Sequence, residues 1–375
     1  AEAEVRKCAL ACRHYAAHAE AYLSDEPIPT DASRSFVHHV PLGPVLAVMP
    51  WNFPFWQVFR FAAPTLMAGN VGLLKHASNV WRCALDIEDV FRRAGFPEGC
   101  FQTLLIGSKD TAPVIRDKRI RAVTLTGSTP AGREVASLAG ECLKPTLLEL
   151  GGADAFIVMP SADLDDAVET AVKARIQNTG QSCIAAKRFL VHAEIYDDFS
   201  NRFIAAFDSL TVGDPLDRST SIGPLATQKI RDDLTTQVDR SLASGASLLT
   251  ARRRLPDAGW FYGPGILSGI PAGSPAADEE LFGPVASLWR VGSIEEAVSI
   301  ANRSDFGLGS VIFSREAGDI GTAIRDLEAG ATFVNSLVAS DPRLPFGGVK
   351  DSGYGRELAA DGIRAFVNRK TVSIA

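Results

Sequence analysis

The amino-acid sequence predicts an α/β protein with two domains, each built on a doubly wound parallel sheet. From Val45 to Leu150, short apolar runs typical of strands alternate with segments whose apolar residues recur at helical spacing. A second alternating stretch runs from Gly151 to about Lys350. Such alternation is typical of parallel strands joined by crossover helices. A chain of 375 residues is long enough for two domains with separate cores.

In the first stretch we expect strands over 45–49, 71–74, 102–106, 121–126 and 146–150, and helices over 55–68, 79–94 and 130–140. An amphipathic helix over 4–23 precedes them, and its predicted buried face is made by Val5, Cys8, Ala9, Cys12 and Tyr15. In the second stretch we expect helices over 163–176, 194–209, 227–244, 294–302 and 317–328. The strands between them are expected near 155–159, 188–192, 285–290, 307–314 and 331–335. The turn-rich segments 217–221 and 256–276 are predicted to be surface loops.

The composition excludes several classes of protein. Hydrophobic residues make up 46% of the chain and charged residues 22%, as in a soluble globular protein. A net charge of −6 without a basic cluster argues against a nucleic-acid partner. No apolar run is as long as a membrane span, and no signal peptide is recognisable. We therefore expect a cytoplasmic protein with no membrane partner.

The cysteines do not form a metal-binding pattern. Cys8 and Cys12 lie one helical turn apart, but no second pair completes a zinc site. His14 and His18 share a helix face without a third ligand, so a solvated face is expected there. The six cysteines are scattered, as expected for reduced thiols in a cytoplasmic protein: Cys8, Cys12, Cys83, Cys100, Cys142 and Cys183. We expect no metal.

One cysteine, Cys183, lies in the polar segment Asn178–Lys187, between a predicted helix and a predicted strand. A free cysteine is usually a small buried hydrophobe. At the junction of two elements, however, a thiol can face a cleft where N–H groups and cations favour the nucleophilic thiolate.

Two further residues complete a pattern for attack on a carbonyl carbon. Glu149 lies in an apolar strand followed by two glycines, and burial generally raises the pKa of a carboxyl toward that of a general base. Asn52 follows an apolar run and stands among aromatic residues, where its amide can donate to an oxyanion. Without the other two residues, Asn52 would be interpreted as a turn residue.

Five motifs stand in an order that resembles the aldehyde dehydrogenase superfamily, from about Val40 to the C-terminus. They are Trp51–Pro54 (WNFP), Glu149–Gly152 (ELGG), Gly180–Cys183 (GQSC), Glu280–Pro284 (ELFGP) and Pro345–Lys350 (PFGGVK). Within the superfamily, Leu74–Ala77 (LKHA) and Ala185–Phe189 (AAKRF) are most similar to bacterial succinate-semialdehyde dehydrogenases. The resemblance implies that Cys183 is the nucleophile, Glu149 the base for hydrolysis and Asn52 an oxyanion donor.

The resemblance also implies a nicotinamide cofactor, although no G-x-G-x-x-G is present. Gly127 and Ser128 lie between a predicted strand and a helix, where free N–H groups can hold a pyrophosphate. Lys75 ends a strand and is expected to contact the adenosine ribose or a 2′-phosphate. Ser78 replaces the glutamate common in NAD-preferring relatives, which favours NADP over NAD. Further cofactor contacts are implied for Trp51, Gly151, Glu280 and Phe282, with Glu280 on the nicotinamide ribose.

The expected substrate is succinate semialdehyde. Arg60 matches an arginine that holds the distal carboxylate in succinate-semialdehyde dehydrogenases, and an arginine fork suits a carboxylate. Ser340 matches a serine used on the same carboxylate, and Phe346 is expected to wall the substrate funnel. Gln177 stands where several relatives have a second arginine. Glutarate semialdehyde and plain aliphatic aldehydes therefore stay open as substrates.

The resemblance implies three parts: a cofactor-binding domain of 1–30 and 41–150, a catalytic domain of 151–350, and an arm of 31–40 with 366–375 that pairs with a partner subunit in a homodimer or homotetramer. Because members usually begin upstream of Ala1, the chain is expected to be N-terminally shortened. An inactive member of the fold is one alternative function. A cysteine hydrolase or acyltransferase is another, but it would need a histidine paired with Cys183, and the candidates, His192 and His76, lie in other segments.

Overall fold

The computed structural model describes residues 2–251 and 253–375. The chain forms two compact units. Unit 1 consists of Ala1–Leu150, Ser340–Gly347 and Gly353–Ala375, and unit 2 of Gly151–Ala339 and Gly348–Ser352. The predicted domain boundary between residues 150 and 151 lies at the same position. Residues 340–347 were predicted to belong to the second domain, whereas they belong to unit 1.

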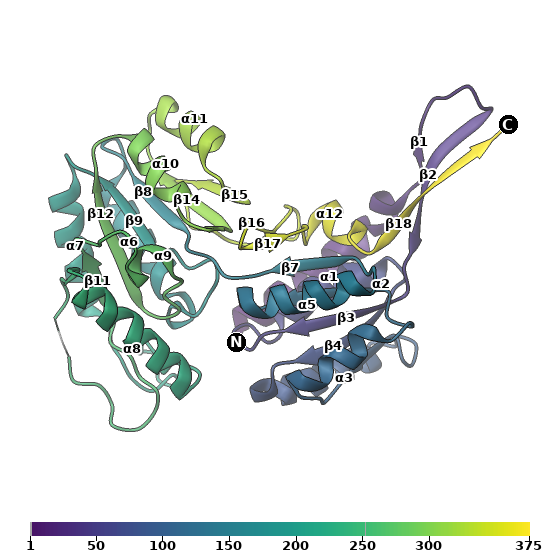
Figure 1. The fold of residues 1–375 in the computed structure, drawn as a ribbon, viewed down its shortest axis with the longest axis horizontal. Helices are drawn as coiled ribbons and strands as arrows, with labels where there is room; N and C mark the ends of the chain where they lie inside the picture. The colour runs from purple at the N-terminus through teal and green to yellow at the C-terminus, as the bar shows by residue number, and fades with distance from the viewer. Residues whose placement is uncertain (1, 252) are drawn as a thin grey trace. The chain divides into compact units, whose positions relative to one another are not determined.

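Unit 1 is built on a six-stranded sheet in the order β17-β7-β6-β3-β4-β5 (Figure 1). Its parallel strands are β3 (Pro44–Met49), β4 (Val71–His76), β5 (Phe101–Thr103), β6 (Ala122–Thr126) and β7 (Thr146–Glu149). The short β17 (Gly353–Tyr354) joins β7 in the antiparallel direction. The five predicted strands are therefore confirmed, and β17 adds an edge from the C-terminal part of the chain.

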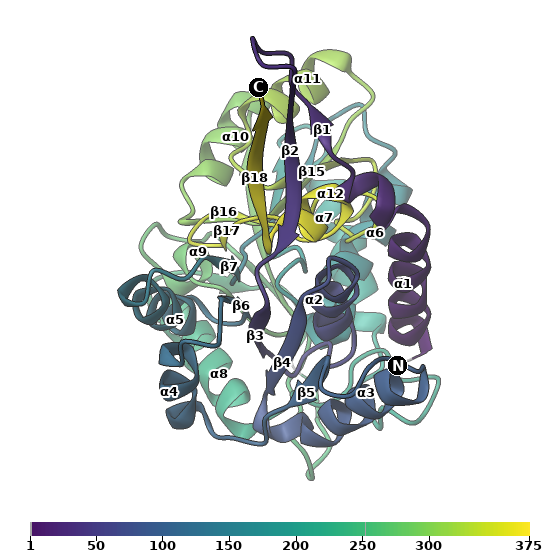
Figure 2. The same cartoon turned by 90° about the vertical axis from the view of Figure 1, so that its right-hand side faces the viewer.

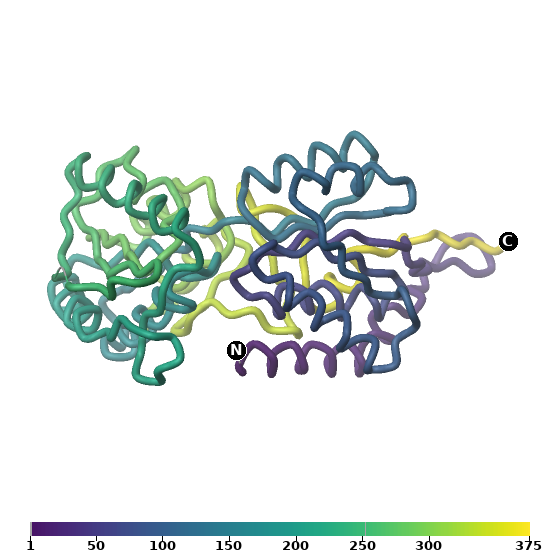
Figure 3. The backbone as a smooth tube through the Cα atoms, turned by 90° about the horizontal axis from the view of Figure 1, so that it is seen from below, coloured from purple at the N-terminus to yellow at the C-terminus, as the bar shows by residue number. Residues whose placement is uncertain are grey.

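The helices of unit 1 are α1 (Glu2–Leu23), α2 (Trp56–Met67), α3 (Trp81–Arg93), α4 (Thr111–Arg116), α5 (Thr129–Glu141) and α12 (Ala359–Arg364). α1, purple in Figure 3, lies on one side of the sheet, and α5, in blue-teal, lies on the other. The predicted buried face of α1 was partly wrong, because Val5 is 54% exposed and the buried residues are Cys8, Ala11, Tyr15 and Ala19. This face packs against α2 and α12 through Ala63 and Ile363.

A three-stranded antiparallel ribbon extends from unit 1. It consists of β1 (Glu26–Pro27), β2 (Arg34–Pro41) and β18 (Val367–Ile374), with β2 in the middle. β2 and β18 run side by side along their whole length, from Val367 opposite Pro41 to Ile374 opposite Arg34 (Figure 2). The C-terminal strand therefore lies beside residues 34–41, as predicted.

Unit 2 is built on a seven-stranded sheet in the order β10-β11-β12-β9-β8-β14-β15. Its strands are β8 (Ala155–Val158), β9 (Arg188–His192), β10 (Ser247–Leu248), β11 (Gly265–Ser268), β12 (Val285–Val291), β14 (Gly309–Phe313) and β15 (Ala331–Val334). Only β10 is antiparallel to its neighbour. Phe156 and Val158 enter one core cluster, while Ala155 and Ile157 enter another, so alternate residues of β8 point to opposite faces.

Helices cover both faces of this sheet, as expected for a doubly wound fold. α6 (Leu164–Ile176) and α7 (Tyr196–Ser209) supply the first cluster, and α10 (Ile294–Asn302) and α11 (Ala317–Asp326) supply the second. α8 (Gln228–Ala243) and the short α9 (Pro275–Asp278) pack together in a third cluster. A two-stranded ribbon, β13 (Phe306–Gly307) with β16 (Val349–Lys350), completes the unit.

The prediction that 256–276 is a surface loop was wrong in part. β11 lies within it, and Ile266 and Leu267 are fully buried between β12 and β10. Glycine and proline on both sides of a four-residue strand gave the segment the composition of a loop. Three of the helices, α4, α9 and α12, are too short to show helical periodicity and were missed for that reason.

In the described part of the chain, every helix is too short or too polar to cross a lipid bilayer.

Candidate active site

Cys183 follows an unusual backbone segment at the end of α6. Asn178, Thr179 and Gly180 all have positive φ values, of 52°, 57° and 74°. The left-handed conformation costs a non-glycine residue on the order of 1–2 kcal/mol. The segment therefore needs other contacts to hold its shape.

Arg175, the penultimate residue of α6, supplies such contacts from the interior. Its Nη1 donates to the Ala186 carbonyl at 2.9 Å and its Nη2 to the Gly180 carbonyl at 2.8 Å. Burial lowers the pKa of this guanidinium to about 9, against the pull of nearby carboxylates. Arg175 thus joins the two ends of the segment that carries Cys183, which we call the cysteine loop (residues 178–187).

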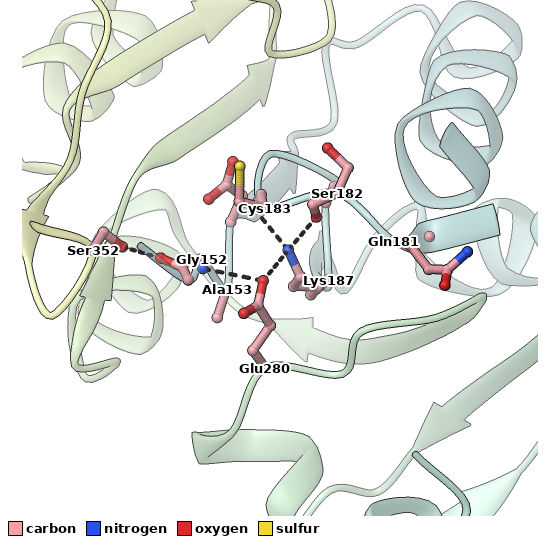
Figure 4. Close-up of polar contacts among 12 residues, drawn as sticks. Gly152, Ala153, Gln181, Ser182, Cys183, Lys187, Glu280 and Ser352 are labelled. Atoms are coloured by element: carbon pink, nitrogen blue, oxygen red, sulfur yellow. Dashed lines mark hydrogen bonds and ion pairs between the residues drawn. The ribbon is translucent and has the colours of Figure 1, made fainter. Parts of the chain in front are cut away.

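Lys187 ties the cysteine loop together at its centre. The side chain is 2% exposed, and its ammonium group donates to the carbonyls of Ser182 at 3.0 Å and Cys183 at 2.7 Å (Figure 4). The same group forms an ion pair with Glu280 Oε1 at 3.1 Å. A buried ammonium needs such partners, because an unpaired buried charge is very unfavourable. Lys187 therefore links the loop of Cys183 to the segment of Glu280.

Two glycines allow Glu280 and the cysteine loop to approach the first turn of unit 2. A Cβ atom on Gly151 would lie 2.6 Å from Glu280 Oε2, and one on Gly152 would lie 2.5 Å from the Cys183 carbonyl. The Gly152 N–H donates to Glu280 Oε1 at 3.2 Å, and Ser352 Oγ donates to the Gly151 carbonyl at 2.6 Å (Figure 4). Side chains at positions 151 and 152 would thus displace the loop or the carboxylate.

Asp154 and Arg188 extend this buried polar network beneath the loop. Burial raises the pKa of Asp154 to about 7, against the charge of Lys187, while its Oδ1 accepts from the Gly309 N–H at 3.0 Å. Burial lowers the pKa of Arg188 to about 10, and its side chain donates to three carbonyls, those of Ala153, Ile300 and Ala301.

In unit 1, Glu149 ends β7 and is 2% exposed. Its carbonyl accepts from the Gly127 N–H at 2.9 Å, which fixes the turn between β6 and α5 against the same strand. Its carboxylate lies 4.0 Å from Arg60 Nη2. The predicted base is thus a buried carboxylate beside a buried guanidinium.

Arg60, on α2, lies at the centre of an arginine cluster that also contains Glu149, Phe346 and Glu357. The guanidinium is ion-paired with Glu357 through Nε, and its carbon lies 4.7 Å from the centre of the Phe346 ring. Phe346 and Glu357 form a β-bridge with two backbone hydrogen bonds of 2.7 Å. Burial raises the pKa of Glu357, although the charge of Arg60 opposes the rise.

One nitrogen of the Arg60 guanidinium, Nη1, has no hydrogen-bond partner among the described residues. Nη2 donates to Thr126 Oγ1 at 3.3 Å and Nε belongs to the Glu357 pair. Within residues 2–251 and 253–375, Nη1 has no hydrogen-bond acceptor.

Ser340, another predicted substrate residue, lies between α1 and α2. Its Oγ accepts from Lys7 Nζ at 2.6 Å and from the indole N–H of Trp56 at 3.2 Å. Lys7 Nζ also lies 4.5 Å from the centre of a Trp56 ring. We call Lys7, Trp56 and Ser340 the donor cluster.

The Trp51–Pro54 turn, which carries Asn52, is hydrogen-bonded to the side chain of His76. His76 Nε2 lies 2.9 Å from the Pro54 carbonyl, which can only accept, while Nδ1 lies 3.0 Å from the Ala77 nitrogen and 3.2 Å from the Met49 carbonyl. Burial lowers the pKa of this imidazole, which favours the neutral form. These contacts join β4 to the Trp51–Pro54 turn. On the far side of the turn, Glu4 Oε1 accepts from the N–H groups of Phe55 and Trp56 at 2.8 Å each, at the start of α2.

The predicted adenosine end of the cofactor site contains a cavity of ≈ 260 Å³ at the carboxyl ends of β4 and β5. Its lining is mostly apolar: His76, Ala77, Ser78, Trp81, Ala84, Thr103, Leu104, Leu105, Ile106 and Gly107. Lys75 ends the same strand, and burial lowers its pKa. Ser128 precedes the 13-residue helix α5, and its hydroxyl makes no capping hydrogen bond to the helix. These features fit the adenosine and pyrophosphate of a dinucleotide.

The structure divides the predicted site residues between the units. Unit 1 holds Trp51, Asn52, Arg60, Lys75, Ser78, Gly127, Ser128, Glu149, Ser340 and Phe346, and unit 2 holds Gly151, Gln177, Cys183, Glu280 and Phe282. Within unit 1, Arg60 contacts Phe346 and lies near Glu149. Within unit 2, Glu280 reaches the first glycines and, through Lys187, the cysteine loop. Gln177 and Phe282 are half-buried.

Sequence reasoning missed three charged residues: Lys7, Lys187 and Glu357. Lys187 was part of a motif used for the resemblance, and its separation of four residues from Cys183 was the available signal. Glu357 follows a segment with two glycines and no recognisable motif, and Lys7 lies on a helix that was predicted from its apolar face. Among the described residues, no group of three histidine, cysteine or acidic side chains is arranged to hold a metal.

Comparisons with known proteins identify the family of this chain. The aldehyde dehydrogenase family profile matches residues 1–372. Succinate-semialdehyde dehydrogenases (NADP(+)) from Mycobacterium avium strain 104 and Mycobacterium tuberculosis strain H37Rv are both 56% identical to this chain. Both alignments cover 100% of this chain, with 80% and 83% of the respective relatives.

Solved structures show the same relationship. The succinic semialdehyde dehydrogenase from Streptococcus pyogenes in complex with NADP+ has a TM-score of 0.96 and 39% identity, over 99% of this chain and 82% of that one. The succinate-semialdehyde dehydrogenase from Burkholderia pseudomallei has a TM-score of 0.95 and 34% identity, over 100% of this chain and 78% of that one. The family match along nearly the whole sequence, together with relatives at 56% identity, places the chain in the aldehyde dehydrogenase family.

Proposed function

We propose that this protein oxidises succinate semialdehyde to succinate with NADP as the electron acceptor. The family supports aldehyde oxidation, and the relatives at 56% identity carry this substrate and cofactor in their names. The observation that carries the substrate assignment is the buried guanidinium of Arg60, whose Nη1 has no acceptor among the described residues. A carboxylate is the ligand that such a guanidinium binds best.

Cys183 is the nucleophile in this proposal. Its thiolate attacks the aldehyde carbon, and the resulting oxyanion accepts hydrogen bonds from the Asn52 amide and the Cys183 N–H. One oxyanion donor is worth roughly 3 kcal/mol of barrier in other enzymes. NADP, when bound, supplies the nicotinamide C4 that accepts the hydride. The acyl group then remains on sulfur as a thioester.

Glu149 is the base for hydrolysis. It takes a proton from water, the hydroxide adds to the thioester carbon, and the C–S bond breaks to give succinate and the thiolate. The guanidinium of Arg60, 4.0 Å away, helps to hold the Glu149 carboxylate in place. This step distinguishes hydrolysis from transfer of the acyl group to coenzyme A.

The cofactor contacts are proposed residue by residue. Ser78 and the apolar cavity beside it take the adenosine end, with Lys75 at the ribose or the 2′-phosphate. Gly127 and Ser128 face the pyrophosphate at the start of α5. Glu280 takes the nicotinamide ribose, while Trp51, Gly151 and Phe282 contact the rest of the cofactor.

The proposed substrate contacts are Arg60 and Ser340 on the carboxylate, with Phe346 and Gln177 lining the path. Because Gln177 is uncharged, it cannot supply the second positive charge that several relatives have there.

The arm is proposed to join subunits. β18 is an edge strand of the ribbon, and most of its residues are exposed, so its outer N–H and C=O groups are available to another chain. We propose a homodimer or homotetramer in the cytoplasm.

Initial rates test the proposed function. Purified protein is assayed with succinate semialdehyde and with butanal, each with NADP and with NAD. We expect kcat/KM to be at least about 10-fold higher for succinate semialdehyde, since a charged hydrogen bond contributes about 1.5–3 kcal/mol. Equal values for both aldehydes would indicate a broad aldehyde dehydrogenase, and faster turnover with NAD would contradict the role of Ser78.

A further inference from the structure

We propose that Lys7 of α1, acting with Ser340, is a second cationic contact for the carboxylate of the substrate and sets the preference for semialdehyde acids over uncharged aldehydes. This inference rests on the proposed function, which it deepens by naming a residue for specificity.

The first observation is a set of hydrogen-bond donors without a matching acceptor. The Ser340 hydroxyl has two acceptor positions, and Lys7 and Trp56 donate to both. Its own hydrogen must therefore point elsewhere, and residues 2–251 and 253–375 offer it no acceptor. Lys7 itself uses only one of its three N–H donors on a side chain.

The second observation concerns charge. In the part of the chain that the structure describes, no carboxylate forms an ion pair with Lys7. Both carboxylate oxygens of the nearby Asp341 instead accept hydrogen bonds from the guanidinium of Arg343. The ammonium is half-buried beside Trp56, and Arg60 is close enough for its positive charge to act on it. Lys7 thus lies near the positive charge of Arg60, which has Glu357 as its own partner, while Lys7 has no carboxylate partner among the described residues.

The electrostatic state of Lys7 agrees with this description. Burial, followed by the charge of Arg60, lowers the pKa of Lys7 to about 8. A bound carboxylate would relieve both effects by supplying the missing negative charge.

The missing ligand is a small monoanion with two acceptor oxygens. A carboxylate can accept from the Lys7 ammonium and the Ser340 hydroxyl together, and its second oxygen can accept from Arg60 Nη1. Lys7 would then supply the positive charge that Gln177 does not provide. Phosphate and sulfate carry more negative charge than the single ammonium group of Lys7 can balance.

The test compares Lys7→Met with Arg6→Met. Methionine keeps the helix propensity and the stem of lysine but removes the charge. Arg6 lies on the same turn of α1, is exposed, and has no hydrogen bond or ion pair within the described residues, so Arg6→Met changes the net charge equally. Steady-state kinetics are measured with succinate semialdehyde and with butanal, at saturating NADP.

We expect Lys7→Met to raise KM for succinate semialdehyde roughly 10-fold to 100-fold, because one charged contact to the carboxylate is lost. KM for butanal should change less than about 3-fold, and Lys7→Arg should restore much of the preference. Arg6→Met should behave as the wild type. In Cys183→Ala protein, calorimetric titration should show that Lys7→Met weakens the binding of succinate by a similar factor.

Three results would count against the inference. An equal rise of KM for both aldehydes would mean that Lys7 only positions the Ser340 loop. An unchanged preference in Lys7→Met would remove Lys7 from the carboxylate site while the proposed function stands. A wild type that does not prefer succinate semialdehyde would overturn the proposed function and this inference with it. If Lys7→Met does not fold, Lys7→Arg and the succinate titration of Lys7→Gln decide.

Discussion

The cysteine loop of unit 2 and the donor cluster of unit 1 each contain a buried or half-buried lysine, and the two lysines differ in their partners. Lys187 donates to two carbonyls and forms an ion pair with Glu280. Lys7 donates to a single hydroxyl. A cation with all its partners supplied by the protein holds a fixed structure, whereas a cation that lacks an anion can bind one from solution.

The same difference separates the carboxylates of the two units. Glu280 is fixed by Lys187 and by the Gly152 N–H. Glu149 and Glu357 share one guanidinium, that of Arg60, so two acids compete for a single positive charge. An arrangement of this kind keeps acid–base chemistry available in unit 1, while the network of unit 2 keeps the nucleophile in position.

The largest expected effect is on catalytic activity, and it distinguishes the nucleophile Cys183 from the base Glu149. Cys183→Ala should abolish aldehyde oxidation, since no thioester can form. Glu149→Gln should leave a rapid first turnover of NADPH and slow the steady state roughly 10²-fold to 10⁴-fold, because only hydrolysis needs the base. Stopped-flow absorbance of NADPH measures both phases. Wild-type steady-state turnover in Glu149→Gln would remove Glu149 as the base.

A smaller effect tests whether Lys187 maintains the structure of the loop. Lys187→Met should destabilise unit 2 by about 3 kcal/mol, because Glu280 would lose its buried partner. Lys173→Met is the matched control, since Lys173 forms an exposed pair with Glu169 within α6 and should contribute less than about 0.5 kcal/mol. Urea unfolding gives both values, and thiol titration reports whether Cys183 becomes more accessible. Equal unfolding midpoints for the two variants would contradict a scaffold role.

The smallest effect concerns pH and the donor cluster. Three charged or titratable groups act on Lys7: Arg60 from α2, Asp341 from the turn after Ser340, and Cys8 from α1. Arg343 holds the pKa of Asp341 near about 2 and burial raises that of Cys8 to about 12, so neither changes charge between pH 7 and 9.

Lys7 has a folded pKa lowered to about 8, so it loses its charge as the pH rises through that value. The ratio of KM for succinate semialdehyde to KM for butanal should therefore rise by up to about 10-fold between pH 7 and pH 9 in the wild type. Using the ratio cancels pH effects on the chemical steps, which are common to both aldehydes. A ratio that stays constant over this range would indicate that Lys7 does not contact the carboxylate.

Local sequence determined the alternation of elements. Strands β3, β4, β6 and β7 and helices α2, α3 and α5 lie close to their predicted positions, because apolar periodicity reports burial directly. The motifs that carry the chemistry were recognisable because they break the local pattern. Glu149 and Asn52 are polar residues at the end of apolar runs, and Cys183 stands in a polar segment between two elements.

Tertiary structure alone decided which distant side chains meet. Lys7 bonds to Ser340 across 333 positions of sequence, and Arg60 pairs with Glu357, which enters unit 1 only because residues 353–375 return to its sheet. Periodicity describes how one element is buried and carries no information about its partners. The sequence by itself thus determined the family, the order of elements and the residues that carry the chemistry. Only the fold showed which charges have partners, because burial and pairing depend on contacts between segments far apart in the chain.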